Sequence, residues 1–191
     1  MKQLNQYIKE KLIINKDYRE VKIVVKSFDE LRKIIIDRYD KLGPGTKRNP
    51  IDFNDIDVSN IDSFCNSKGK GLFEYTYFNY IDISDWDVSN VKSMRHMFYW
   101  CRELRSIGDI SNWDVSSVTD MSHMFSYCTT LLSVGDISKW NISNVEDMSF
   151  MFECFKKFNQ DISNWDISNV RVIMYMFGGC PIKDEYKPKF K

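Results

Sequence analysis

Apolar positions recur at a fixed period through the last two thirds of the chain. Four tryptophans mark the period, and the intervals between them are 27, 27 and 25 residues: Trp86, Trp113, Trp140 and Trp165. Each stands in a unit that reads Asp-Ile-Ser-x-Trp or a close variant, and a Val, two Met-like positions and a Phe follow at matching offsets. A period of this length is typical of a chain wound into stacked coils, with one repeat in each coil. The sequence therefore predicts a repeat solenoid of about five coils over residues 51–180, the first of them degenerate.

Two local patterns alternate within each coil. In the second half of one coil, Val118, Met121, Met124, Phe125 and Cys128 follow a spacing close to one helical face. This spacing predicts one or two turns of α or 3₁₀ helix on one side of each coil. The first half, Asp-Ile-Ser-x-Trp-Asp-Val, is rich in β-forming residues and predicts a short strand. The expected fold class is therefore an α+β repeat solenoid.

Residues 1–50 lack the repeat and predict a helix, a strand and a second helix. A helical stripe lies within residues 4–12, and residues 18–26 alternate between apolar and polar positions as a strand does. Ser27 and Glu30 form a capping-box pattern, so a helix should follow, with one face made by Phe28, Leu31, Ile35, Tyr39 and Leu42. Gly43-Pro44-Gly45 should end it. We expect residues 1–50 to cap the first coil and residues 181–191 to form a closing cap or a tail.

The charge balance argues against a nucleic-acid partner. Lys plus Arg equals Asp plus Glu, at 27 each, so the chain has no overall basic field. Residues 1–50 nevertheless carry 13 basic and 7 acidic side chains. This asymmetry is either ordinary variation or a basic segment that docks on an acidic surface.

The sequence has no run of 18 apolar residues and no secretory signal at its start. We therefore expect no membrane span and a cytoplasmic or virion-associated location. Five cysteines follow the repeat rather than a disulfide framework, which favours reduced thiols.

No catalytic, cofactor-binding or metal-binding site is expected. His96 and His123 stand at equivalent positions of consecutive coils, which indicates an aromatic-sized side chain at the edge of the core rather than a catalytic pair. The recurring Asp, Asn and Ser residues fit bend caps, because their side chains bond nearby backbone amides. The alternative is a ladder of carboxylates that binds calcium. The methionine row and the cysteines at one repeat position, Cys101, Cys128 and Cys180, are expected in the core.

A partner protein should use positions that vary from coil to coil, because these are free of the packing constraint. Two sets vary in this way, one before the Trp and one after the Val. They are Asp85, Asn112, Lys139 and Asn164, and Lys92, Thr119, Glu146 and Arg171.

The repeated unit Asp-Ile-Ser-Asn-Trp-Asp-Val-Ser-Asn-Val-x-x-Met-x-x-Met-Phe resembles the BspA-type leucine-rich-repeat surface proteins. This repeat class is also known as DUF285, a domain of unknown function in mycoplasma lipoproteins. The resemblance implies leucine-rich-repeat-like coils that serve adhesion or protein binding. Members are typically long and secreted or lipid-anchored, whereas this chain is short and shows no signal. We therefore expect a non-enzymatic protein–protein interaction module with an unidentified protein partner.

The first ten residues suggest an alternative. Met1 to Glu10 resemble the short amphipathic leaders that send internal proteins into the heads of tailed phages, with Ile8-Lys9-Glu10 at the cleavage pattern. This resemblance implies a structural or internal virion component whose partners are virion proteins.

Overall fold

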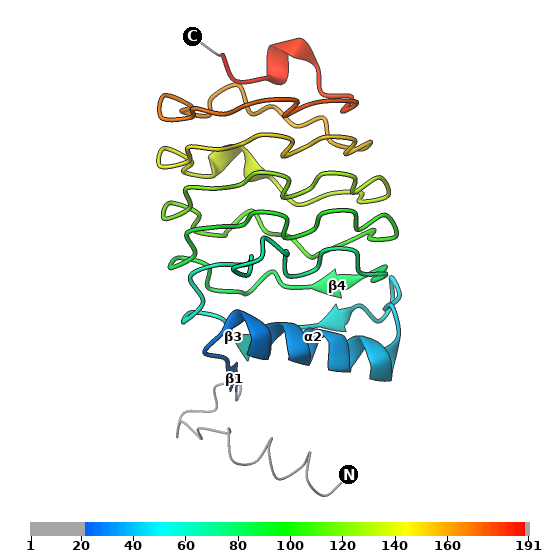
Figure 1. The fold of residues 1–191 in the computed structure, drawn as a ribbon. Helices are drawn as coiled ribbons and strands as arrows, with labels where there is room; N and C mark the ends of the chain where they lie inside the picture. Colours follow the sequence, from blue (N-terminus) through cyan, green and yellow to red (C-terminus); the bar gives the residue numbers. More distant parts are fainter. Residues whose placement is uncertain (1–21, 190–191) are drawn as a thin grey trace, which may run out of the picture.

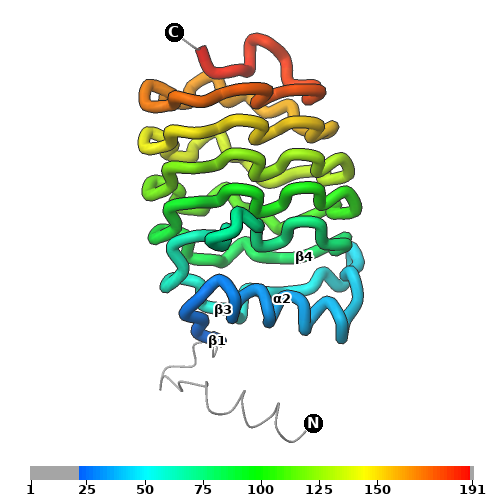
Figure 2. Tube along the Cα trace, in the orientation of Figure 1, coloured from blue at the N-terminus to red at the C-terminus, as the bar shows by residue number. Residues whose placement is uncertain are grey.

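The computed structural model describes residues 22–189, which form a stack of layers with a helix at one end (Figure 1). We call the residues of one repeat a layer. Figure 2 shows the chain passing from the helical end to residues 181–189 at the opposite end, one layer after another. The regular elements are β1 (Ile23–Val24), α2 (Phe28–Leu42), β2 (Ile51–Asp52), β3 (Ile56–Asp57), β4 (Ile81–Asp82) and two 3₁₀ turns, Ile137–Lys139 and Asp184–Tyr186. β1 pairs with β3 and β2 pairs with β4, both in parallel.

The predicted fold class, an α+β repeat solenoid of leucine-rich-repeat-like coils with a helix–strand–helix cap, is wrong. The described residues hold one α-helix and four two-residue strands in two two-stranded sheets, which is a sparse α+β fold. The Asp-Ile-Ser-x-Trp segments after β4 form no strand, and the Met-Phe segments form turns instead of α or 3₁₀ helix. Residues 22–50 hold β1 and α2, and the helix predicted over residues 4–12 lies outside the described residues.

The backbone of the Met-Phe segments explains this difference, because its amides alternate between two kinds of acceptor. The amides of His96 and Phe98 donate to the carbonyls of Ser122 and Met124 in the next layer, at 3.0 Å each. The amide of Met97 between them donates to Met94, three residues back. A helix needs consecutive bonds within the chain, and a strand needs every bond to go outward. This alternation satisfies neither pattern, yet it bonds each layer to the next.

Helix α2 begins where the capping pattern predicts. Ser27 accepts a hydrogen bond from the Glu30 amide, and Gly43 ends the helix with a φ of 74°. Leu31 and Ile35 are buried in the core, and Phe28 and Tyr39 pack against it. Leu42 was expected on the same face, but 67% of its surface is exposed because it lies in the last turn, beyond the edge of the stack.

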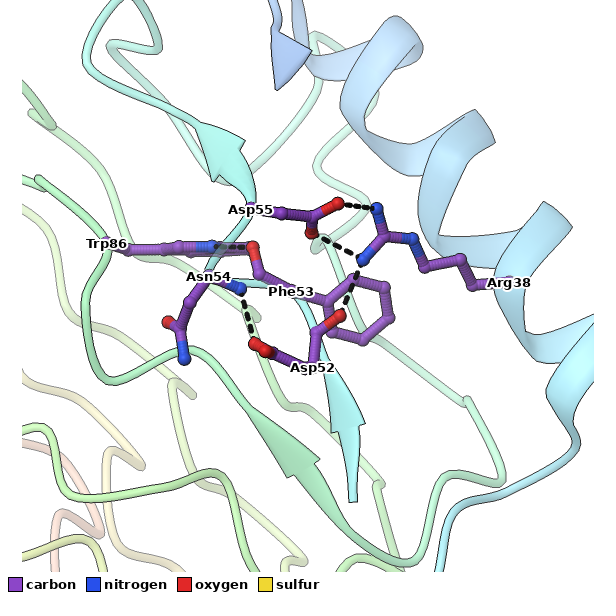
Figure 3. Close-up of polar contacts among 6 residues, drawn as sticks. All are labelled: Arg38, Asp52, Phe53, Asn54, Asp55 and Trp86. Atoms are coloured by element: carbon purple, nitrogen blue, oxygen red, sulfur yellow. Dashed lines mark hydrogen bonds and ion pairs between the residues drawn. The ribbon is translucent and has the colours of Figure 1, made fainter. Parts of the chain in front are cut away.

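Arg38 holds α2 on the first layer (Figure 3). Its guanidinium makes two 2.6 Å bonds to the Asp55 carboxylate and a 2.5 Å bond to the Asp52 carbonyl. In the same view, the Trp86 indole N–H donates to the Phe53 carbonyl at 2.9 Å. The other three repeat tryptophans make the same bond to an isoleucine carbonyl of the preceding layer, so an indole pins each layer to the one before it.

The core is a column of side chains repeated in each layer. Five phenylalanine rings stack nearly parallel, with 5.3–6.0 Å between successive centroids: Phe73, Phe98, Phe125, Phe152 and Phe177. The methionines before these rings are buried as expected from Met94 to Met151. Cys101 and Cys128 are buried free thiols, whereas Cys180, in the last repeat, is only partly buried. Burial raises the pKa of Cys101 to about 12, so this thiol stays protonated.

The recurring acidic and hydroxyl residues lie where bends were predicted. The side chains of Asp87, Asp114, Asn141 and Asp166 each accept a hydrogen bond from the serine amide two residues later, at 3.0–3.2 Å. The bend-cap interpretation is therefore confirmed for these four positions.

Candidate functional site

The eight predicted partner-binding residues are all exposed. The structure brings four of them into one column, because the amides of Thr119, Glu146 and Arg171 each donate to the corresponding residue of the preceding layer, beginning at Lys92, at 2.7–2.9 Å. Glu146 and Arg171 also form an ion pair at 3.2 Å. The other four, Asp85, Asn112, Lys139 and Asn164, precede the tryptophans and do not share these bonds. Their role in partner binding stays a prediction.

A second surface feature is a band of aromatic rings in contact with one another, which we call the aromatic band. Its first column is His96, His123, Phe150 and Tyr175, with centroids separated by 4.7, 4.5 and 5.5 Å. Its second column is Tyr75, Trp100 and Tyr127, with separations of 5.8 and 5.0 Å. Tyr99 lies between the columns, with its ring centroid 5.0 Å from that of His96 and 5.5 Å from that of Tyr75. The two ends of the band are the most open, since Tyr75 is 52% exposed and Tyr175 66%.

The aromatic band rests on an unusual backbone. Apart from Tyr99, each of its residues has a φ between 51° and 61°, in the left-handed region that glycine prefers. His96 and Trp100 are third residues of four-residue turns, closed by bonds from the Met97 and Cys101 amides to the Met94 and Phe98 carbonyls. This position takes a positive φ in a type II turn. Bulky residues held there cost about 1–3 kcal/mol each and persist only where the surroundings fix them.

Polar groups within the band complete its surface. The Arg102 guanidinium lies 3.6 Å from the Trp100 ring centroid, a cation–π contact. The Trp100 indole N–H and the His123 Nδ1 are buried and make no hydrogen bond within residues 22–189. Tryptophan and arginine are among the residues most enriched at the energetic centres of protein interfaces.

The environment of His123 keeps its ring neutral. Burial and, to a smaller extent, the neighbouring His96 and Arg95 lower its pKa to about 4. Its ring lies 4.5 Å from Phe150 and nearly parallel to it, so it packs as an aromatic side chain. This agrees with the interpretation of the two histidines as aromatic-sized residues at the edge of the core.

Sequence reasoning identified the repeat position of the first column, as an aromatic-sized residue at the edge of the core, but it missed the second column. His96, His123, Phe150 and Tyr175 share one repeat position, which the alignment shows. Trp100 and Tyr127 also share a position, two residues after the core phenylalanine, but Cys154 and Gly179 occupy it in the later repeats. That change of residue type hides the column, because the shared feature is the left-handed backbone rather than the side chain.

Neither a metal cluster nor a membrane helix is seen in the described part of the chain. Within residues 22–189, no group of three or more His, Cys, Asp or Glu side chains is placed to hold a metal ion. Over the same residues, no helix has the length and apolar character needed to cross a bilayer. The leader-like residues 1–10 lie outside the described residues.

Comparison with known proteins identifies the family. The family described as "Mycoplasma protein of unknown function, DUF285" matches residues 51–187, which include every layer of the stack. Comparison with curated proteins and with solved structures found no match. The matched region covers well over half of the chain and contains the repeats on which the resemblance was based. The chain therefore belongs to the DUF285 family.

Proposed function

We propose that this protein is a non-enzymatic protein-binding module that uses the aromatic band as its main contact surface. The observation that carries the proposal is the band itself, in which seven rings are held in two columns on left-handed backbone. Aromatic side chains are enriched at the centres of protein interfaces, where a few of them supply most of the binding energy. Rings already fixed by stacking lose little conformational entropy when a partner covers them.

Layer-to-layer bonding supports this proposal. Apart from Tyr175 in the last layer, each ring of the band stands on a layer that donates several backbone hydrogen bonds to the next, so the columns keep their spacing without a ligand. Arg102 over Trp100 adds a cation at the second column, and Arg with Trp and Tyr is the residue combination most enriched at interface hot spots.

The test is a double substitution, Trp100→Gly with Tyr127→Gly. Gly179 occupies the equivalent position of the last repeat with a φ of 64°, so glycine fits this backbone and the variant should fold. Tyr77→Ser is the matched control, because Tyr77 is 69% exposed and lies outside the band. Proteins captured from the native source by each immobilised chain would be quantified by mass spectrometry, and binding of each purified candidate would be measured by calorimetry.

We expect the double variant to lose a partner that the parent chain and Tyr77→Ser both retain. A partner bound equally by all three chains would refute the role of the band. If the parent chain binds no partner saturably, the protein-binding function is refuted.

A further inference from the structure

The C-terminal end of the stack carries an unfilled row of backbone hydrogen-bond donors. In each inner layer, four alternate amides of the Met-Phe segment donate to four carbonyls of the next layer, as those of Met148, Phe150, Phe152 and Cys154 do to the last layer, at 2.7–2.9 Å. The equivalent amides of the last layer are Ile173, Tyr175, Phe177 and Gly179. Within residues 22–189, none of these four amides has an acceptor. We call residues 171–179 the open edge.

Side chains along the open edge are also uncovered. Ile173 is 38% exposed and Met174 57%, whereas Met148 and Ser149, at the equivalent positions one layer earlier, are 0% and 7% exposed. Residues 181–189 cover a different part of the last layer, where the Tyr186 carbonyl accepts the Ile162 amide at 3.0 Å. Beside the edge lies a surface hollow of about 350 Å³, lined by Trp165, Ile173 and Lys189 among others.

The charge of the edge specifies what it can bind. Four donors face outward against one carbonyl, that of Arg171, whose counterparts in the inner layers accept amides of the following layer. Cationic side chains lie beside the donors: Arg171 stands at one end, where it also pairs with Glu146 at 3.2 Å, and Lys156, whose ammonium bonds the Gly179 carbonyl at 3.0 Å, stands at the other. Oriented amides and cations together favour acceptor groups and negative charge.

We propose that the open edge binds an acidic polypeptide segment of a partner protein, which adds to the stack as one further parallel layer. Peptide addition to an exposed edge is a common recognition mode, in which main-chain bonds supply affinity and side chains supply specificity. The partner's carbonyls accept the four amides, and its acidic side chains meet Arg171 and Lys156. This surface is separate from the centre of the aromatic band, so the inference stands on its own contacts.

The same geometry argues against a second copy of this chain as the occupant. Two open edges facing each other would set donors against donors. A head-to-tail arrangement would bring the edge to the other end of the stack, where α2 lies over the first layer (Figure 1) and already bonds several of its carbonyls. Arg38 takes that of Asp52, and Arg32 takes those of Gly71 and Leu72.

A suitable probe comes from the chain's own sequence. Residues 144–154 present four carbonyls to the preceding layer in the required register and contain Glu146, Asp147 and Glu153. A fluorescent synthetic peptide of these residues, with Cys154→Ser to avoid oxidation, would be titrated with the full chain and followed by anisotropy. A peptide with all three acidic residues replaced by lysine is the charge control.

We expect saturable binding that weakens with salt, since the attraction between charges at a surface is screened. Arg171→Glu should weaken binding about fivefold or more, and Lys92→Glu, the same charge change at the equivalent exposed position of an inner layer, should change it by less than about twofold. Bound peptide should also slow hydrogen exchange at the amides of Ile173, Tyr175, Phe177 and Gly179.

Three results would overturn the proposal. One is unchanged exchange at all four amides in the presence of the peptide. Another is equal binding of the charge-reversed peptide, or equal effects of the two glutamate variants. The third is protection of the same amides by self-association without peptide, which would assign the edge to a second copy. Trp100→Gly with Tyr127→Gly should leave peptide binding intact, so this proposal and the proposed function fail separately.

Discussion

Replacing Phe125 by alanine tests whether the phenylalanine column holds the layers together. The ring is fully buried, and its centroid lies 5.6 Å from that of Phe98 and 6.0 Å from that of Phe152, with both rings nearly parallel to it. Removing a buried phenylalanine side chain from a core costs about 3–5 kcal/mol, because the lost burial and the remaining cavity add. Small domains are stable by about 5–15 kcal/mol, so this one change should remove a large share of the stability.

A phenylalanine at the end of the column provides the comparison with Phe125. Phe177 ends the column, is only partly buried and stacks on Phe152 alone, at 5.8 Å. Phe177→Ala should therefore cost roughly half as much as Phe125→Ala, about 1.5–2.5 kcal/mol. Phe125→Leu keeps most of the volume and should cost about 1.5 kcal/mol or less.

Urea unfolding followed by circular dichroism and tryptophan fluorescence would give these free energies, provided that the two signals report one transition. Equal losses for Phe125→Ala and Phe177→Ala would refute the reasoning, since the inner ring would then contribute no more than the end ring. A loss below about 1 kcal/mol for Phe125→Ala would also refute it, because a buried ring of this size cannot be removed so cheaply from a close-packed core.

Three further predictions use the same measurement. Ser27→Ala should lower the free energy of unfolding by about 1 kcal/mol, because the Glu30 amide loses its cap, and no change would show that α2 does not depend on it. Trp113→Phe should lower the free energy of unfolding by at least about 1 kcal/mol, since the hydrogen bond from the indole to the Ile83 carbonyl is lost. An unaltered urea midpoint would show that the indole bonds do not hold the layers together. The pKa of His123 is about 4 in the folded chain, below its ordinary value of 6.5, so the unfolded chain takes up this proton first as pH falls. Stability should therefore decline between pH 6.5 and 4, and His123→Phe should reduce that decline; identical pH profiles for the two chains would contradict it.

The sequence predicts the repeat, the core positions and α2 because each depends on residue type at a known spacing. Ser27 and Glu30 mark the helix start through a side-chain bond that the structure contains. The tryptophan and methionine periods identify buried positions because an apolar side chain must be covered wherever it recurs. The partner-binding positions had no such constraint, so the sequence could say only that they vary.

The error in fold class has a physical cause. Inward-facing residues at 118, 121, 124, 125 and 128 fit a helical face, but a succession of four-residue turns gives the same spacing. Deciding between them requires the sign of φ at His123 and Tyr127, which is positive at both. Residue type gives no warning, since a histidine or tyrosine ordinarily favours a negative φ. The second column of the aromatic band was missed for the same reason. Its members share a positive φ, and Gly179 is the one residue type at this repeat position that favours such a φ.

The direction of the backbone bonds makes the two ends of the stack chemically different. At the first layer the exposed groups are carbonyls, and residues 23–38 meet them with donors: the amides of Ile23 and Val25, and the guanidinium groups of Arg32 and Arg38. At the last layer the exposed groups are mainly amides, beside the one carbonyl of Arg171, and residues 181–189 meet only the amide of Ile162. Buried carbonyls without donors would be costly, whereas amides left in contact with water are not. The chain is therefore stable with its open edge unfilled. Further polypeptide can be added at the amide end, whereas at the other end α2 and β1 already lie against the first layer (Figure 1).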